Sequence, residues 1–299
     1  MLKHCSLLNS HEWSEVLRKG FGAERIETVG DSGNLLVWTV FSKYGVKVAY
    51  VNFPVGLEDD AASEIRSIES TFRVLRASGV HIARLSTIAS VVAGSPGLVH
   101  EVDLVETCIE DLKVWQESQL ARSVASKVRK ARKLGVTIRT ARPDEGSLLH
   151  RMYSEVIKRR NGRHRYTLGY FQALCGMAAV NKSVSIGVVC DAEQTTCGFI
   201  VACHSADRSY YLHGGFLEEF SHLRPGYIGM VWAIERSREF GCSQFNMLTS
   251  PRNQSSLVEY KESFGAASRK RRYFVAPLSL VGRSIVAVMT TLRRLQRDI

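Results

Sequence analysis

Two apolar, β-branched runs stand on either side of a short polar turn near the start of the chain. Residues 35–41 (LLVWTVF) and 46–53 (VKVAYVNF) are typical of strands, and the turn SKYG between them predicts a β-hairpin. Residues 62–77 then place apolar side chains at helical spacing, so we expect an amphipathic helix there. Short strands are predicted over 81–85 and 100–105.

The rest of the chain alternates helical and strand patterns. One or two helices are predicted over 109–134, and Gly135 ends them before a strand at 136–140. The further elements expected are helices over 145–158, 168–177, 227–240 and 255–264 and strands over 184–190, 199–204, 209–216, 242–248 and 272–275. An antiparallel meander followed by a helix and a strand predicts an α+β fold.

The composition is that of a globular protein of 299 residues, with 45% hydrophobic and 23% charged residues. Its apolar runs fall far short of the roughly 18 residues of a membrane span, and its start lacks the apolar stretch of a secretory signal. We therefore expect a cytoplasmic protein without a transmembrane helix. The seven cysteines include no C-x-x-C pair, so buried thiols are expected rather than disulfides or a metal site.

The net charge of +11 is concentrated in one segment of the chain. Residues 121–165 hold 14 lysine and arginine residues against three acidic residues, whereas residues 1–120 hold 11 against 16. Two interpretations remain open. The segment forms solvated helix faces, or it lines a groove for an anionic ligand such as a diphosphate or a nucleic acid.

Three stretches of the second half carry a family pattern. The stretches are VRKARKLGV at 128–136, then YYLHGG at 210–215 with LRPGYIG at 223–229 and GCSQFN at 241–246, and finally YKESFGA at 260–266. In order and spacing they resemble the FemAB-type branch of the GNAT acyltransferases, proteins built of two GNAT-like lobes. The family often has aspartate where Asn246 stands here.

The resemblance implies a fold and its division into domains. We expect an α+β fold with tandem GNAT-like lobes, each a mixed, mostly antiparallel sheet flanked by helices. A degenerate N-terminal lobe would span residues 1–120 and an acyltransferase lobe residues 121–276. A basic amphipathic tail helix would span residues 277–299.

The resemblance also implies an activity. The expected reaction is N-acyl transfer from acyl-CoA, above all acetyl-CoA, to an amine of a sugar or cell-envelope precursor, without a metal. One alternative is an aminoacyl-tRNA-dependent peptidoglycan transferase, with the basic segment as a track for tRNA. The other is a non-catalytic anion- or RNA-binding protein on the same fold.

The loop at 224–229 is the candidate site for the acyl-CoA donor. It follows a strand and opens a helix, so backbone N–H groups and the positive helix end would face a pyrophosphate. The residues assigned to it are Arg224, Gly226, Tyr227, Ile228 and Gly229. The alternative is a Pro-Gly turn that only begins a helix.

Lys261 is the first candidate for catalysis, with Tyr260 beside it. The resemblance implies that this lysine faces the acyl donor and stabilises charge in the transition state. We expect its side chain to be exposed near the end of a helix, where the alternative role is a contact with the last carbonyl groups.

His213 and three arginines complete the candidate site. His213 ends a strand before two glycines and is a candidate general base, against the alternative of a histidine with a purely structural role. Arg160, with Arg163 and Arg165, would bind a phosphate of the substrate, and the alternative is a solvated face.

The tail is expected to form an amphipathic helix. Apolar residues from Val281 to Leu295 fall on one helical face, and most of the arginines lie off it. Such a helix packs on the body of the protein or lies on an anionic membrane surface, which would place the protein at the inner face of the membrane.

Overall fold

The computed structural model describes residues 7–29, 35–51, 70–88, 97–205 and 207–295. Its contacts divide the chain into two compact units. Unit 1 comprises Met1–Leu2, Gly22–Val105 and Lys270–Ile299, and unit 2 comprises Lys3–Phe21 and Glu106–Arg269. The boundary therefore falls inside two strands, β5 (Val99–Ile109) and β11 (Ala267–Pro277). The predicted lobe boundaries, at residues 120 and 276, stay a prediction.

Unit 1 contains a mixed group of strands. They are β1 (Glu24–Val29), β2 (Leu35–Lys43), β3 (Val46–Val51) and β4 (Ile82–Ile88), with most of β5 and β11. The strands β1, β2 and β3 form an antiparallel meander, whereas β4 lies parallel to β3 and antiparallel to β11. The predicted hairpin is confirmed, and its turn places Tyr44 and Gly45 in the left-handed region, with φ of 51° and 75°.

Residues 70–77 and the tail helix α8 (Leu280–Leu295) supply helices to unit 1. The core around Trp38 and Leu75 joins the β2–β3 hairpin to the helical residues 70–77. The predicted helix over 62–77 is thus confirmed in its second half, and residues 62–69 lie outside the described part. A second apolar cluster joins Val286 of α8 to Ile82 and Val275.

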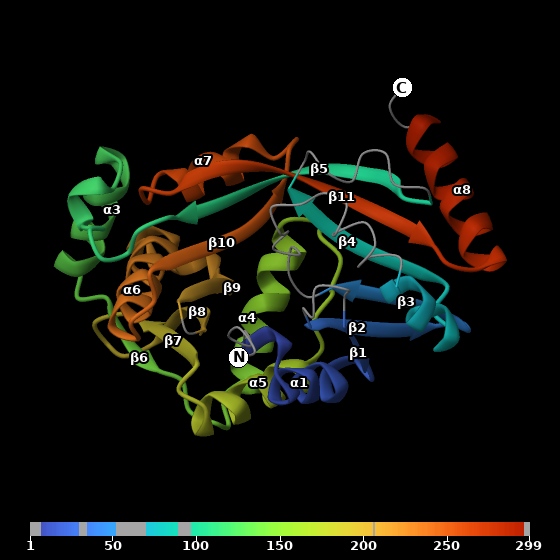
Figure 1. The fold of residues 1–299 in the computed structure, drawn as a ribbon. Coiled ribbons are helices and arrows are strands. Elements are labelled where there is room, and N and C mark those ends of the chain that lie inside the picture. The colour runs from blue at the N-terminus through green and yellow to red at the C-terminus, as the bar shows by residue number, and fades with distance from the viewer. Residues whose placement is uncertain (1–6, 30–34, 52–69, 89–96, 206, 296–299) are drawn as a thin grey trace. The chain divides into compact units, whose positions relative to one another are not determined.

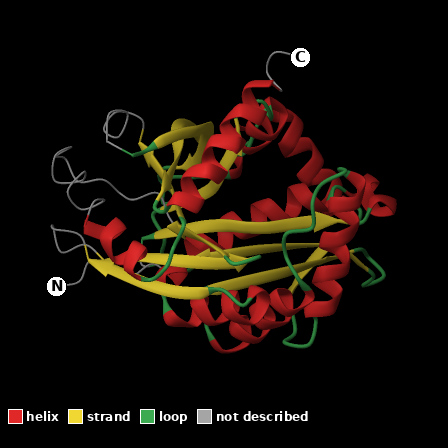
Figure 2. Ribbon diagram, turned by 90° about the vertical axis from the view of Figure 1, so that its right-hand side faces the viewer, coloured by secondary structure: helices red, strands yellow, loops and turns green. Residues whose placement is uncertain are grey.

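Unit 2 alternates helices and strands. In chain order its elements are η1 (Leu7–Asn9), α1 (His11–Phe21), η2 (Glu117–Gln119), α3 (Arg122–Lys133), β6 (Thr137–Thr140), α4 (Gly146–Arg159), α5 (Leu168–Val180), β7 (Val184–Cys190), β8 (Thr196–His204), β9 (Arg208–Phe216), η3 (Glu218–Leu223), α6 (Pro225–Glu239), β10 (Gln244–Pro251) and α7 (Ser255–Glu262). The strand order is β10-β9-β8-β7-β6, and β5 lies beside β10. Figure 2 distinguishes the helices, in red, from the strands, in yellow.

Helices cover the two faces of this sheet, as Figure 1 shows for unit 2. Successive side chains of β8 point to opposite faces of the sheet, so their contacts show which helices pack on each face. Ile200 and Ala202 join the core that contains α3 and α6, whereas the Phe199 ring meets Phe171 of α5 at a centroid distance of 6.1 Å. The helices α3 and α6 thus pack on one face, and α4 and α5 pack on the other.

Two irregularities in β9 and β10 shape the interior of unit 2. β9 has a bulge against β8, because Val201 pairs with His213 and Ala202 pairs with Tyr211, which leaves Leu212 unpaired. β9 and β10 run parallel, and their register covers only three pairs, the last of which joins Asn246 to Tyr210. Beyond that pair the two strands part.

Most of the predicted elements are confirmed within a few residues, and two regions differ. The stretch 109–121 contains no α-helix, because β5 continues to Ile109 and a turn and the short 3-10 helix η2 follow. The indole of Trp115 donates a hydrogen bond to the Phe264 carbonyl over 2.9 Å, which fixes this stretch against the end of α7. The helix α1 and the strand β1, in addition, were not predicted from the sequence.

The helix α8 packs on unit 1 with one face only. Gly282 and Val286 are buried, whereas Val281, Val288 and Leu292 are exposed. In the described part of the chain no helix is long and apolar enough to cross a membrane. Contact of the exposed stripe with a membrane surface stays a prediction.

Candidate active site

Three tyrosines gather beside the point where β9 and β10 part. Tyr211 follows Tyr210, the last residue of β9 that pairs with β10. Tyr227 lies in the first turn of α6, and Tyr260 lies in α7. All three pack against the core of α3 and α6, and the rings of Tyr227 and Tyr260 are 5.5 Å apart. We call these residues the tyrosine cluster.

One cation of the basic segment bonds to the tyrosine cluster, and a second acts on it through its charge. The Lys127 ammonium donates a hydrogen bond to the Tyr227 hydroxyl over 2.9 Å and lies 4.4 Å from the centre of its ring. Burial raises the pKa of Tyr211 to about 12, and the charge of Arg160 acts in the opposite direction. Arg160 also opposes the raised pKa of Tyr260. The two basic stretches of the sequence, in α3 and after α4, therefore both act on the tyrosine cluster.

The N-terminus of α6 borders the tyrosine cluster. Arg224 precedes the helix in the left-handed conformation, with φ of 62°, and Pro225 begins it. The Tyr260 hydroxyl donates a hydrogen bond to the Gly226 carbonyl over 3.0 Å. A Cβ at Gly226 would meet nothing nearer than 3.6 Å, so the fold does not itself require glycine there. Pro225 has no N–H and the Tyr227 N–H donates to the Arg224 carbonyl over 3.1 Å, so the Gly226 N–H is the first-turn donor suited to bind an anion.

The later residues of the predicted donor loop turn toward the core. Ile228 is buried with Leu223 and Val189, and Gly229 packs against Val189 and Ile200. Within the loop at 224–229, Arg224, Gly226 and Tyr227 are the residues with partly exposed surface.

Lys261 is buried, which corrects the expectation of an exposed side chain. Only 4% of the residue is exposed, because α7 turns it toward β10. Its ammonium donates hydrogen bonds to the Leu248 carbonyl over 3.1 Å and to the Ser250 hydroxyl over 2.8 Å. Burial lowers the pKa of Lys261 to about 8, since removal from water disfavours the charged form. The amine thus lies against β10 just beyond its last pair with β9.

His213 lies on the other face of the sheet. A regular strand would place Tyr211 and His213 on the same face, but the bulge at Leu212 separates them. The His213 ring packs among Tyr166, Tyr170 and Phe171, and its Nε2 shares a 2.7 Å hydrogen bond with the Tyr170 hydroxyl. Burial lowers the pKa of His213 to about 3, so the ring is neutral at physiological pH.

The structure does not bring all the candidate arginines together. The charge of Arg160 acts on the tyrosine cluster, whereas that of Arg165 acts on Tyr166, beside His213. The Arg165 backbone N–H bonds to the Tyr153 hydroxyl. Arg163 is exposed in the same loop. Sequence reasoning did not assign Lys127 or Tyr211 to the site, although Tyr211 lies in a motif that carries the resemblance and Lys127 directly precedes another.

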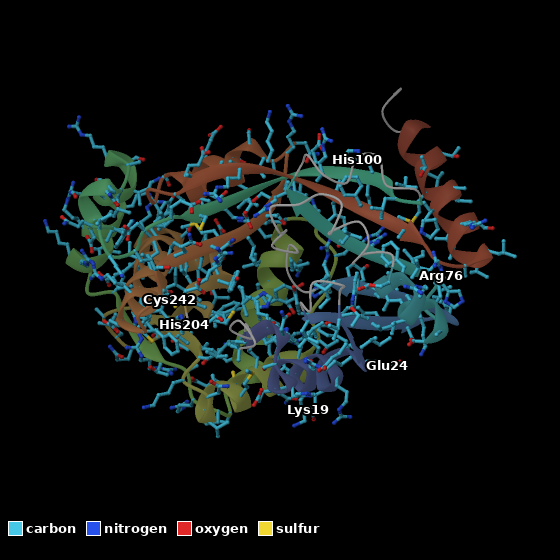
Figure 3. The ribbon with its side chains drawn as sticks, viewed as in Figure 1. Lys19, Glu24, Arg76, His100, His204 and Cys242 are labelled. Atoms are coloured by element: carbon cyan, nitrogen blue, oxygen red, sulfur yellow. The ribbon has the colours of Figure 1, made fainter. Side chains whose placement is uncertain are left out.

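Other reactive side chains in unit 2 are buried in structural contacts. His204 bonds to the hydroxyls of Ser185 and Ser209 and stacks on Phe240, and Figure 3 shows it near Cys242. Burial lowers the pKa of His204 to about 4. Among the described residues no group of three histidine, cysteine, aspartate or glutamate side chains is arranged to hold a metal ion.

The comparison with protein families identifies this unit. Residues 118–262 match the model of the acetyltransferase (GNAT) domain. This match identifies a GNAT-type acyltransferase domain within unit 2. The GNAT domain makes the chain an acyltransferase, so the expectation of an enzyme is confirmed and the non-catalytic alternative is set aside. A search of curated proteins gave no match.

Solved structures resemble both units of the chain. FemX has a TM-score of 0.66 at 13% identity, and the match covers 90% of this chain and 93% of FemX. L-PGS from Bacillus licheniformis has a TM-score of 0.59 at 14% identity over 98% of each chain. A tandem GNAT protein from the clavulanic acid biosynthesis pathway has a TM-score of 0.52 at 9% identity, over 83% of this chain and 81% of its own. These likenesses confirm the predicted GNAT-like fold.

Proposed function

We propose that the protein transfers an acyl group from acyl-CoA, above all acetyl-CoA, to an amine of a sugar or cell-envelope precursor. The observation that carries this proposal is the parting of β9 and β10 next to a helix N-terminus, with Lys127 bonded to Tyr227 and the charge of Arg160 acting on Tyr211 and Tyr260. The helix end and the cations suit the diphosphate of such a donor.

In the proposed reaction the amine nitrogen bonds to the thioester carbonyl carbon and the carbon–sulfur bond breaks. The amine loses one proton, and the CoA thiolate gains one. Positioning and electrostatic stabilisation supply most of the rate in such a transfer. Lys261 is suited to this work because its ammonium lies on β10, just beyond the last pair with β9. The site is buried, so the charge acts more strongly there than it would in water.

The donor site is tested by thermal unfolding in the presence of CoA. Bound CoA stabilises the folded state by about 2.7 kcal/mol at a hundred times its dissociation constant. Gly226→Val places a branched side chain at the mouth of the first turn of α6 and is expected to abolish this stabilisation. Gly176→Val is the matched control, since Gly176 lies in α5 with open space around it. Equal stabilisation of wild type and Gly226→Val would place the donor elsewhere.

A second candidate is an aminoacyl-tRNA donor with a peptidoglycan precursor as acceptor. The observation that favours it is the exposed basic face of α3, with Arg122, Arg129, Lys130 and Lys133. Affinity for tRNA that falls steeply with salt, without stabilisation by CoA, would support this candidate. Reversing Arg160 and Arg163 to glutamate would then weaken tRNA binding, whereas under the first proposal it weakens CoA binding.

A further inference from the structure

Asn246 holds two groups at the point where β9 and β10 part. It forms the last pair with β9 and is only 4% exposed. Its amide nitrogen donates a hydrogen bond to the Glu106 carboxylate of β5 over 2.9 Å. Its amide oxygen accepts the backbone N–H of Leu248 over 2.7 Å. One side chain therefore ties a buried carboxylate to the backbone two residues further on.

Leu248 adopts a backbone conformation that leucine rarely takes. Its φ is 60°, in the left-handed region, which costs a residue with a Cβ about 1–2 kcal/mol. The hydrogen bond from its N–H to the Asn246 side chain forms an Asx turn, which stabilises this conformation. The Leu248 carbonyl then accepts a hydrogen bond from the Lys261 ammonium.

The same contacts explain why an amide suits position 246. Aspartate would accept the Leu248 N–H equally well, but it has no N–H to donate to Glu106. Two carboxylates at hydrogen-bond distance in a buried site repel each other, and one of them must take up a proton. The departure from the family's common aspartate thus matches the presence of Glu106.

We infer that Asn246 and Glu106 are positioning residues for Lys261. Glu106 fixes the Asn246 amide, the amide fixes the turn at Leu248, and the turn presents its carbonyl to the Lys261 ammonium. This inference rests on the proposed role of Lys261 in acyl transfer. It adds a buried hydrogen-bonded chain that holds the amine beside the point where β9 and β10 part.

The test exchanges the two functional groups. Asn246→Asp sets two carboxylates against each other and is expected to lower kcat at least about tenfold with little change in the KM for acetyl-CoA. In Asn246→Asp combined with Glu106→Gln, the new glutamine donates to the new aspartate, which still accepts the Leu248 N–H. This double variant is expected to recover kcat to within about threefold of wild type. Asn181→Asp is the matched control, since Asn181 accepts the Ser183 N–H in the same kind of turn.

A second readout does not depend on turnover. In protein labelled with carbon-13 at the lysine ε-carbon, the Lys261 resonance is assigned by its loss in Lys261→Met. Asn246→Asp is expected to shift this resonance, and the double variant is expected to return it toward the wild-type position. An unchanged resonance in folded Asn246→Asp, or no recovery in the folded double variant, overturns the inference. If Asn246→Asp fails to fold, the Lys261 resonance and kcat of the double variant are compared with those of Glu106→Gln instead.

The two readouts also separate this inference from the proposed function. A resonance that shifts and recovers while kcat stays constant in all variants supports the positioning chain and removes Lys261 from the reaction. Loss of kcat without a change in the resonance leaves Lys261 in the reaction and overturns the positioning chain.

Discussion

Burial gives Lys261 properties that distinguish it from the lysines of the basic segment. An exposed lysine stays protonated far above neutral pH, whereas burial brings the pKa of Lys261 to about 8. Its two hydrogen bonds, to the Leu248 carbonyl and the Ser250 hydroxyl, hold the amine in one place. A fixed ammonium in a dry site stabilises developing negative charge without reorganisation of solvent.

Lys261→Met removes this charge and keeps most of the side-chain length. If Lys261 stabilises the transition state, kcat is expected to fall about 10²-fold or more, with a smaller change in the donor KM. The fold is expected to survive, since methionine suits a buried site and a helix. Steady-state kinetics with acetyl-CoA and an amine acceptor measure the effect. Values within about twofold of wild type would exclude Lys261 from the mechanism.

At the scale of elements, the sequence predicted the strands well but did not show the bulge in β9. Alternation places Tyr211 and His213 on the same side of β9, and only the pairing with β8 shows the bulge that separates them. The sequence likewise did not predict the burial of Lys261. This burial depends on the contact of α7 with β10, which the local sequence does not encode.

The stretch 109–121 shows the same limit. Its apolar spacing fits a helix, yet Trp115 is held by the Phe264 carbonyl, 149 residues away along the chain. Tertiary contact thus overrides local propensity there. The α6 loop and the α7 motif, in contrast, were recognised from the sequence, because glycine, proline and aromatic residues at fixed spacing identify them directly.

The helix α8 depends on one close backbone contact. Gly282 lies against the His81 carbonyl, and a Cβ added there would overlap that oxygen. Gly282→Ala is expected to lower the free energy of unfolding by about 1–3 kcal/mol, because backbone must shift to admit the methyl group. Gly176→Ala in α5 has open space and is expected to stabilise by up to about 1 kcal/mol. Urea unfolding of both variants checks this, and equal effects would show that α8 is not packed as described.

At the scale of the whole molecule, the charge of the chain has a definite place. Residues 121–165, which hold 14 basic and three acidic residues, lie in unit 2, within the GNAT domain. Part of it is neutralised locally, as where Arg139 pairs with the buried Glu145 and Arg132 pairs with Glu117. The cations at the tyrosine cluster and along α3 are those that the proposed function assigns to an anionic substrate.

Two buried neutral histidines predict a dependence of stability on pH. The pKa of His213 falls from 6.5 to about 3 in the folded state, and that of His204 falls to about 4. Between about pH 4 and 6.5 the unfolded chain therefore binds more protons, so the free energy of unfolding decreases as pH falls. Each histidine contributes a slope of up to about 1.4 kcal/mol per pH unit. Urea unfolding of His213→Gln is expected to show the smaller slope, and parallel curves would contradict this assignment.

The placement of the cysteines offers a way to observe one unit at a time. The described cysteines, Cys108, Cys175, Cys190, Cys197, Cys203 and Cys242, are all buried, and all belong to unit 2. Residues 22–105 and 270–299 contain none. Burial raises the pKa of Cys108, Cys175 and Cys197 to about 12, so these thiols react only when the structure opens. The rate at which a thiol reagent labels these six cysteines in the native protein thus reports the local opening of the catalytic unit alone, without any engineered probe.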